Sequence, residues 1–572
     1  MIRTLLKEVK EYKAASIATP IFMILEVLFE TLIPFLMIID KGVNTGDIHH
    51  IYKVGGIMIV AAFLGLLAGM AGGRYGAKAS TGFAKNLRNA MFDRIQTYSF
   101  ANIDHFSTAG LVTRLTTDVT NVQNAYQMML RMMMRAPASM VCAMVMALAI
   151  NARLASIYLV AVLILGIILF FIIRHATAYF QQAFPKYDAL NESVQENVSA
   201  IRVVKAYVRE EEETSKFKRA SKNIYDIFVK AEKNVIWNAP IMMFTVYTCI
   251  ILISWFGAKM IVVDSLTTGE LMSLLAYCMN ILMSLMMLSM VFVMISMSMA
   301  SMRRIAEVLN EKTDIHNPEH PVYEVADGSI TFKNVDFSYK KDSAEKVLKD
   351  INLEIHSGET IGIIGGTGCG KSSLVNLVSR LYDASEGTVR VGGRDVREYT
   401  LESLMEQVSM VFQRVYLFAD TVENNIKFGC PGATHEQVVE AAKKACCHDF
   451  ISALPDGYNT VIGEGGATLS GGEKQRISIA RCLLKDAPIV IFDEATANVD
   501  PENEDQLQKA MEALTREKTV LMIAHRLKTV RGADQILVVD QGRVVQKGTH
   551  DELIQQAGID PYFFGLLFIL NL

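Results

Sequence analysis

The stretch ETIGIIGGTGCGKS (residues 359–372) decides the fold of the C-terminal half of this 572-residue chain. Its apolar beginning predicts a buried β-strand, and the pattern SSLVNLVSRLY that starts at its last serine predicts an amphipathic helix. Between them lies G-x-x-x-x-G-K-[ST], the pattern of a phosphate-binding loop, in the strand–loop–helix context that makes it specific. Apolar runs alternate with helical patterns afterwards, so we predict an α/β P-loop NTPase domain around a largely parallel sheet.

Each residue type in this loop has a physical role in holding phosphate. The glycines let backbone N–H groups wrap around phosphate oxygens, the Lys371 ammonium reaches the β- and γ-phosphates, and the Ser372 hydroxyl is a ligand for Mg²⁺. Cys369 lies inside the loop, so we hypothesise that alkylation of its thiol impairs nucleotide binding. The residues expected to contact the nucleotide here are Gly365, Gly366, Thr367, Gly368, Cys369, Gly370, Lys371, Ser372 and Ser373.

Three later segments end in polar groups suited to hydrolysis of the same nucleotide. The apolar run PIVIFDE ends in Asp493, which is placed to hold Mg²⁺ through water, and in Glu494, which is placed to polarise the attacking water. A lone histidine is usually structural, but His525 follows the predicted strand 519–524, at the end of the sheet where ligands collect. We therefore expect it to contact the γ-phosphate. Gln413 follows another apolar run and is placed to sense the metal and the water.

A second candidate phosphate site lies in LSGGEKQRISIAR (residues 469–481). A serine and two glycines ahead of an amphipathic run present backbone N–H groups and a partial positive charge to an anion. A nucleotide has one triphosphate, and the Lys371 loop already holds one side of it. We therefore predict that Ser470, Gly471 and Gly472 contact the γ-phosphate of a nucleotide held by a second copy of the domain. Two domains would then bury two nucleotides head to tail.

The N-terminal half has the composition of a membrane domain. Hydrophobic residues make up 51% of the chain, and the excess lies before residue 304. A spanning helix needs ~20 apolar residues, and six stretches meet or approach that length, which predicts an α-helical six-span transmembrane domain. The predicted domains are residues 1–304, a polar linker over 305–328 and the nucleotide domain over 329–572. The six stretches are 14–39, 54–73, 136–152, 155–173, 239–261 and 271–302.

Basic residues in the loops predict the orientation. Residues 74–135 hold eight Lys or Arg against three acids, and residues 174–233 hold eleven Lys or Arg. Because cytoplasmic loops carry the excess of Lys and Arg, both loops, the N-terminus and the nucleotide domain are expected to lie in the cytoplasm. The chain is thus predicted to be a multi-pass protein of the cell membrane. As helices, the two loops would extend tens of Å below the bilayer.

Overall composition excludes several classes of partner and site. A pI near 6.3 and a net charge of −4 argue against nucleic acid. Eight scattered cysteines show neither disulfide nor metal spacing, which favours reduced thiols. Residues 1–13 have an apolar and a lysine-rich face, so they are expected to form a helix on the membrane surface rather than a cleaved signal peptide.

Two features of the spans are candidates for contact with cargo. Glu26 and Glu30 lie one helical turn apart in the first span, where ionisable groups are costly and often functional. The alternative is that they lie near an interface or pair with a buried basic group. The sixth span carries ten methionines, whose flexible side chains suit a surface that repacks around varied ligands. Ordinary lipid-facing or helix-packing residues are the alternative there. Neither feature names a cargo.

The motif order resembles the nucleotide domain of ATP-binding cassette (ABC) transporters. It runs Tyr339, GGTGCGKSS, Gln413, LSGGEKQR, IVIFDEAT, Asp500 and His525. Six spans fused ahead of such a domain resemble the half-transporters of the ABC exporter type, and the likeness covers essentially the whole chain. It implies ATP and Mg²⁺ as cofactors, Tyr339 stacked on adenine, and Asp500 at the seam of a cassette dimer. Residues 100–106 and 201–207 would be short coupling helices that touch the cassettes.

Departures from the family pattern bear on the partner. Cys369 replaces the usual small residue, and ANVD stands where SALD is usual, but no catalytic group is lost. The cytoplasmic stalks resemble those of bacterial multidrug exporters, particularly subunits of heterodimers, in which one chain often has a degraded site. This chain keeps both Glu494 and LSGGE, so a homodimer would have two competent sites. A paralogous second half-transporter remains the alternative.

The resemblance implies ATP-driven export of amphipathic small molecules, multidrug or lipid-like. ATP binding would close the cassette pair and switch the cavity from inward to outward facing. Hydrolysis would reset it, with Glu494 as base and Lys371 and Mg²⁺ stabilising phosphoryl charge. An importer of metal-chelate cargo on the same architecture and an ATP-gated sensor share every motif and stay open as alternatives.

Overall fold

The computed structural model describes residues 1–36, 46–340, 345–466, 469–494, 501–524 and 527–555. The chain forms two compact units. The first comprises residues 1–97 and 106–312, and the second comprises residues 98–105 and 313–572. A segment of eight residues between α3 (Ile48–Gln96) and α5 (Thr108–Thr113) therefore belongs to the second unit.

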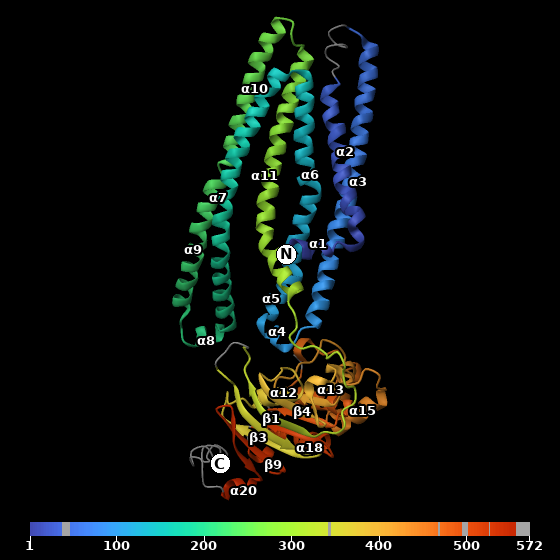
Figure 1. The fold of residues 1–572 in the computed structure, drawn as a ribbon, viewed down its shortest axis with the longest axis vertical. Helices are drawn as coiled ribbons and strands as arrows, with labels where there is room; N and C mark the ends of the chain where they lie inside the picture. Colours follow the sequence, from blue (N-terminus) through green and yellow to red (C-terminus); the bar gives the residue numbers. More distant parts are fainter. Residues whose placement is uncertain (37–45, 341–344, 467–468, 495–500, 525–526, 556–572) are drawn as a thin grey trace. The chain divides into compact units, whose positions relative to one another are not determined.

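The first unit is entirely helical in its described part, and its long helices run in one general direction (Figure 1). Six helical stretches are long and apolar enough to cross a membrane, which confirms the predicted number of spans. The helix α3 holds 49 residues, so at 1.5 Å per residue it is about 70 Å long and extends far beyond the ~30 Å hydrocarbon layer. The helices are α1 (Ile2–Lys7), α2 (Lys13–Phe35), α3 (Ile48–Gln96), α5 (Thr108–Thr113), α6 (Val119–Ile150), α7 (Ala152–Ser199), α8 (Ile201–Ala206), α9 (Glu210–Val235), α10 (Asn238–Val262) and α11 (Thr268–Asn310).

Tyrosine hydroxyls tie the membrane helices together inside an apolar core. Tyr158 of α7 donates to the carbonyl oxygen of Leu274 in α11 at 2.7 Å, and Tyr277 of α11 donates to that of Thr31 in α2 at 2.8 Å. Both tyrosines are fully buried. Because water is scarce in such a core, an unpaired hydroxyl there would be costly, so these bonds fix how the helices pack.

A π-helical turn, Arg114–Asp118, joins α5 to α6. It turns the carboxylate of Asp118 inward, where only 1% of the residue is exposed. That carboxylate accepts hydrogen bonds from Arg304 Nε at 2.7 Å and from Ser301 Oγ at 2.8 Å, both on α11. These bonds therefore fasten the start of α6 to the C-terminal part of α11.

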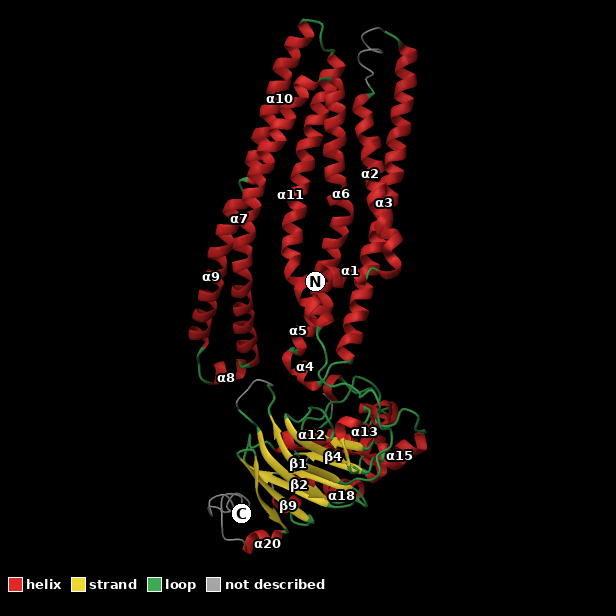
Figure 2. Cartoon of the chain, viewed as in Figure 1, coloured by secondary structure: helices red, strands yellow, loops and turns green. Residues whose placement is uncertain are grey.

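The second unit contains two sheets, which Figure 2 shows in yellow. The larger sheet has the order β10-β9-β3-β8-β7-β6 and is parallel except for β10, and the smaller antiparallel sheet has the order β2-β1-β4-β5. The central strands are apolar and buried, as strands covered on both faces are. The strands are β1 (Ile330–Phe337), β2 (Leu348–Ile355), β3 (Thr360–Gly365), β4 (Glu386–Val391), β5 (Arg394–Asp395), β6 (Val408–Val411), β7 (Ile489–Asp493), β8 (Thr519–Ile523), β9 (Gln535–Asp540) and β10 (Arg543–Gly548).

Helices and aliphatic side chains cover these sheets and complete the α/β domain predicted from the sequence. Two large apolar clusters form its core, one on each side of the parallel strands. The helices of this unit are α4 (Phe100–His105), α12 (Lys371–Val378), α13 (Leu401–Glu406), α14 (Val422–Lys427), α15 (His435–Lys444), α16 (His448–Ser452), α17 (Gly471–Lys485), α18 (Pro501–Thr515), α19 (Leu527–Val530) and α20 (His550–Gln555).

The chain between the two halves is packed. The helix α11 continues to Asn310, because Ile305, Ala306 and Val308 are buried at its end. Further along, the backbone N–H of Val322 donates to the carbonyl oxygen of Glu398 at 2.8 Å. Residues 313–328 therefore belong to the second unit.

Candidate functional site

The phosphate-binding loop connects β3 to α12, and glycine is required at both of its ends. A Cβ on Gly365 would lie 2.1 Å from the carbonyl oxygen of Val539 on the neighbouring strand β9. Gly370, the N-cap of α12, has φ 104°, which L side chains rarely adopt. The loop therefore folds tightly and leads into the N-terminus of a helix, where anions are favoured.

Lys371 begins α12 and turns back over the loop. Its Nζ donates to the carbonyl oxygens of Gly365 and Gly366, both at 2.9 Å, and only 5% of the residue is exposed. Both acceptors are neutral carbonyl oxygens, so neither supplies a counter-charge. A phosphate oxygen is the group that suits this position.

Ser372 and Asp493 meet beside the loop. Ser372 Oγ donates to Asp493 Oδ1 at 3.0 Å. The parallel pairing of β3 with β8 and of β8 with β7 brings the two together, because it aligns the carboxyl ends of these strands. Hydroxyl and carboxylate oxygens are hard ligands of the kind that Mg²⁺ prefers. The pair therefore fits the expected metal, with Ser372 as a ligand and Asp493 holding Mg²⁺ through water.

Gln413 and Glu494 form a second polar pair at the same sheet edge. The Nε2 of Gln413 donates to Glu494 Oε2. Strands β6 and β7 pair in parallel with Val411 opposite Phe492, so the residues that follow each strand lie side by side. Glu494 has φ 51°, a left-handed conformation that is costly for a non-glycine residue and clusters at functional sites. The turn directs its carboxylate toward the amide of Gln413.

Tyr339 lies beyond the other end of the loop. The residue is 47% exposed, and the rings of Phe337 and Tyr382 pack edge-on against its ring. Its hydroxyl forms a 2.8 Å hydrogen bond with the hydroxyl of Ser373 in the first turn of α12. The structure thus brings the aromatic residue next to the loop, as stacking on a nucleotide base requires.

The LSGG segment begins α17, away from the phosphate-binding loop. Ser470 is the N-cap and forms a capping box, in which its N–H donates to Glu473 Oε2 at 2.8 Å and its Oγ accepts from the N–H of Glu473 at 3.3 Å. Helix α17 packs against α14, α15, α18 and β6, whereas α12 packs against β3, β4 and β8. The two candidate phosphate sites of one chain therefore belong to different parts of its cassette.

Two expected site residues, Asp500 and His525, lie outside the described residues. The strand that precedes His525 is described. The N–H of Ala524, directly after β8, donates to the carbonyl oxygen of Ile363 in β3 at 3.2 Å. The chain therefore approaches residue 525 next to the strand that leads into the phosphate-binding loop.

The thiol of Cys369 faces the core. Only 7% of the residue is exposed, and it belongs to the apolar cluster beneath the smaller sheet. Burial raises the pKa of this thiol, which lowers the fraction of reactive thiolate. We therefore expect this thiol to react slowly in the folded protein. The hypothesis that its alkylation impairs nucleotide binding stays a prediction.

Glu26 and Glu30 of α2 share one partner, Arg135 of α6. Its Nη1 lies 3.0 Å from Glu26 Oε1, and its Nη2 lies 2.9 Å from Glu30 Oε2. Of the two readings of these glutamates, the structure supports pairing with a basic group. Sequence reasoning missed Arg135 because it counted this residue among the charges of a cytoplasmic loop, whereas α6 carries it into the helix bundle.

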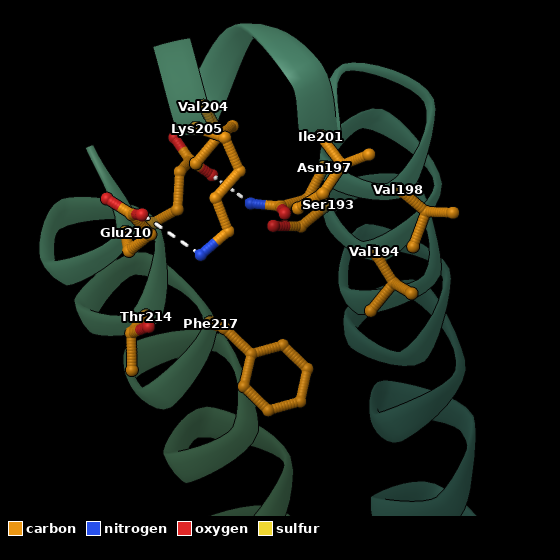
Figure 3. Close-up of a pocket in the computed structure, with 11 residues that line it drawn as sticks. Ser193, Val194, Asn197, Val198, Ile201, Val204, Lys205, Glu210, Thr214 and Phe217 are labelled. Carbon is orange, nitrogen blue, oxygen red and sulfur yellow. Dashed lines mark hydrogen bonds and ion pairs between the residues drawn. The ribbon is translucent and has the colours of Figure 1, made fainter. Parts of the chain in front are cut away.

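The helices α7 and α9 form a hairpin with α8 at its tip. Beneath α8, a cavity of about 430 Å³ lies between the end of α7 and the start of α9 (Figure 3). Asn197 Nδ2 donates to Glu213 at 2.9 Å and Lys205 Nζ to Glu210 at 3.0 Å, and these bonds brace the tip. The apolar residues around α8 are 40–80% exposed, which leaves an uncovered surface of Val194, Val198, Ile201, Val203, Tyr207 and Val208.

The comparisons with known proteins agree with this architecture. Residues 16–286 match the family described as ABC transporter transmembrane region, and residues 348–497 match the one described as ABC transporter. The uncharacterized ABC transporter ATP-binding protein YfiB of Bacillus subtilis is 35% identical over 550 residues, 96% of this chain and 95% of the relative. The chain belongs to the ABC transporter family.

Other relatives of the transporter have the same organisation along most of their length. The ATP-dependent lipid A-core flippase of Desulfotalea psychrophila is 34% identical over 478 residues, which cover 83% of this chain and 82% of the flippase. The uncharacterized ABC transporter ATP-binding protein YknU of Bacillus subtilis is 32% identical over 475 residues, 82% of this chain and 81% of the relative. One transmembrane region and one cassette on a single chain make the protein a half-transporter of the bacterial exporter type.

Proposed function

We propose that the transporter is a multi-pass protein of the cell membrane that exports amphipathic small molecules with the energy of ATP hydrolysis. The observation that carries this proposal is the convergence of Lys371, the Ser372–Asp493 pair and the Gln413–Glu494 pair at one sheet edge. These groups supply what phosphoryl transfer to water needs, namely a cation for phosphate, a metal site and a carboxylate beside a water-orienting amide. Residues 1–304 form the transmembrane domain, 305–328 the linker and 329–572 the cassette.

Each residue of the site has one task. The glycine loop and Lys371 bind the phosphates, and Ser372 and Asp493 hold Mg²⁺, with Gln413 at its side. Bound Mg²⁺ neutralises charge on the phosphate oxygens. Glu494 accepts a proton from the attacking water, His525 contacts the γ-phosphate, and Tyr339 stacks on adenine. The catalytic roles of Glu494 and His525 come from the motif and its place in the sheet.

A second chain completes each site. Ser470, Gly471 and Gly472 lie on a helix with other neighbours than the phosphate-binding loop, so they are placed to cap a nucleotide held by a partner, with Asp500 at the seam. The capping bonds of Glu473 to Ser470 occupy the same helix N-terminus that a γ-phosphate would occupy. We propose a homodimer because LSGGE and Glu494 are both intact. The exposed apolar tip at α8 then contacts the cassette of the partner.

The methionine-rich helix α11 supports an amphipathic cargo. Its buried residues are aliphatic side chains, a tyrosine and several small serines. Six methionines of the helix are 39–65% exposed in the single chain: Met272, Met279, Met283, Met286, Met290 and Met297. Flexible thioethers can adapt to varied apolar ligands. Relatives named as lipid A-core flippases make a lipid-like amphiphile a reasonable class of cargo. Glu26 and Glu30 are less suited to bind cargo directly, because Arg135 already pairs with both.

Transport in vesicles of known sidedness tests the proposal. In vesicles with the cassettes outside, ATP should drive the dye Hoechst 33342, or a fluorescent phospholipid, into the lumen or the inner leaflet. Glu494→Gln should keep ATP binding and lower hydrolysis by at least about a hundredfold, and transport should stop with it. Depletion of the lumen would instead identify an importer. Hydrolysis without movement of any probe would identify a sensor, and hydrolysis by Glu494→Gln at the wild-type rate would refute the role of Glu494.

A further inference from the structure

The C-terminal end of α12 is a junction of several parts of the second unit. The helix ends in a left-handed turn at Arg380, whose φ is 51°, and the N–H of Leu381 donates to the carbonyl oxygen of Asn376 at 3.0 Å. This turn directs the segment RLYD (residues 380–383) away from the helix axis. The nucleotide site lies at the other end of α12, at Lys371, so one short helix joins the site to this segment.

Tyr382 binds the coupling segment α4 on one side. Its hydroxyl donates to Asp104 Oδ2 at 2.6 Å, and its ring lies edge-on to that of Phe100, with centroids 6.2 Å apart. Burial and the nearby Asp104 carboxylate raise the pKa of Tyr382 well above its usual value, so the hydroxyl stays protonated and remains a donor. Both contacts reach α4, which is continuous along the chain with α3 before it and α5 after it.

On its other side, Tyr382 touches the residue expected to stack on adenine. The rings of Tyr382 and Tyr339 are perpendicular, at 89°, with centroids 5.1 Å apart. The ring of Phe337 also packs against Tyr382, at 5.7 Å. Edge-to-face aromatic pairs prefer this geometry, so a change in the orientation of one ring is opposed unless the other follows.

The neighbouring residue Arg380 fixes the segment against the chain that leaves α11. Its Nη2 donates to the carbonyl oxygen of His316 at 3.1 Å, and its Nε donates to Asp383 Oδ1 at 3.0 Å. Ser99, just before α4, also donates to Asp314 of that chain, at 2.6 Å. The hydrogen bonds of Arg380 thus hold the segment that carries Tyr382 in place. From this position Tyr382 contacts α4 on one side and Tyr339, its contact nearest to the nucleotide, on the other.

We propose that Tyr382 is a positioning residue that transmits nucleotide occupancy from Tyr339 to α4. Adenine stacked on Tyr339 restrains that ring, the perpendicular contact restrains the ring of Tyr382, and the hydroxyl bond to Asp104 carries the restraint into α4. The inference rests on the proposed function, because it takes Tyr339 as the adenine-stacking residue. It adds a defined route between the nucleotide and the first cytoplasmic loop, and Tyr382 itself need not touch ATP.

Two tryptophans allow a test without knowledge of the cargo. The chain has only Trp237 and Trp255, and both lie at α10 in the membrane unit. Their fluorescence therefore reports events in the membrane unit and not in the cassette. The experiment uses the full chain in nanodiscs in the Glu494→Gln background, titrated with ATP, and measures nucleotide binding separately with MANT-ATP.

Two substitutions remove the hydroxyl bond from either end. Tyr382→Phe keeps the ring packing, and Asp104→Asn removes the carboxylate. In each variant we expect MANT-ATP affinity within twofold of the parent and an ATP-induced tryptophan change of half or less. The double variant should show no further loss, because both substitutions break one bond. Tyr323→Phe, at a residue that is 69% exposed in the same unit, is the matched control and should keep the full change.

The outcomes separate the two proposals. A full tryptophan change in both single variants, or a loss that merely follows weaker MANT-ATP binding, overturns the role of Tyr382 and leaves the proposed function in place. If the Glu494→Gln parent binds MANT-ATP but shows no tryptophan change on ATP binding, the role of Tyr382 is overturned as well. A parent that binds no nucleotide at all overturns the proposed function. If Tyr382→Phe does not fold, Asp104→Asn decides the result.

Discussion

Replacement of Arg135 by methionine removes the basic partner that Glu26 and Glu30 share inside the helix bundle. Methionine keeps much of the aliphatic volume and removes both the charge and the hydrogen bonds to Glu26 and Glu30, which are 3.0 and 2.9 Å long. The Glu26 side chain is 19% exposed and that of Glu30 is 46% exposed. The cost should therefore come mainly from Glu26.

The magnitude follows from these exposures. Removal of one member of a buried charge pair costs about 3–5 kcal/mol, and an exposed pair contributes about 0–1 kcal/mol. Glu26 is nearer the buried limit and Glu30 is nearer the exposed limit. We therefore expect Arg135→Met to lower the free energy of unfolding by about 3 kcal/mol in total. For a unit of this size, that loss should lower the denaturation midpoint by about 5–10 °C.

Fluorescence of Trp237 and Trp255 provides the assay, because both report on the membrane unit. Thermal denaturation of Arg135→Met in nanodiscs should show the lower midpoint. The triple variant that also carries Glu26→Gln and Glu30→Gln should regain most of the lost thermal stability, because no uncompensated charge remains. Arg135→Lys, which keeps the charge but not the two-pronged geometry, should lie in between.

Two results would refute this reasoning. If Arg135→Met melts at the wild-type temperature, the pair contributes nothing to stability and the glutamates are free for another task. If the triple variant is as unstable as Arg135→Met, then lost side-chain packing, not uncompensated charge, causes the defect. A triple variant that is stable yet transports no probe would return Glu26 and Glu30 to the list of cargo contacts.

Two further predictions concern the cassette. In the native protein, N-ethylmaleimide should modify the exposed Cys430 within minutes and leave Cys369 unmodified, and ATPase activity should be unchanged. Peptide mass spectrometry measures the labelling at each cysteine. Rapid labelling of Cys369 would contradict its burial. Chains carrying Lys371→Ala and chains carrying Ser470→Arg should each be inactive alone. Their co-assembled mixture should regain about a quarter of wild-type hydrolysis, because half of the dimers have one intact site; no recovery would argue against sites shared between chains.

The sequence predicted the parts of the protein that repeat a strong local pattern. Six apolar stretches predicted the membrane helices, and the G-x-x-x-x-G-K-[ST] pattern predicted the strand, loop and helix around Lys371. Gln413 was expected only to sense the metal and the water; the parallel pairing of β6 with β7 brings it to Glu494, and a hydrogen bond joins the two. Their catalytic roles stay predictions.

Contacts between segments distant along the chain could not be predicted in this way. Arg135 follows three methionines just before the predicted third span and gave no sign that it pairs with α2. Tyr382 lies in an ordinary amphipathic pattern, and its role depends on rings from β1 and α4 that only the fold brings together. Burial of Asp118 depends on a π-helical turn, which shifts the helical phase by one residue and leaves no mark in the hydrophobic period.

Because α4 belongs to the second unit, the C-terminal half of the chain is not a self-contained module. A fragment that starts at residue 313 would lack Phe100 and Asp104, and would leave the aromatic cluster of Tyr382, Tyr339 and Phe337 uncovered. Such a fragment is expected to be less soluble than its sheet and core suggest. A chimera that exchanges cassettes between relatives should therefore transplant residues 98–105 together with the C-terminal half, because the two have to match as one folded body.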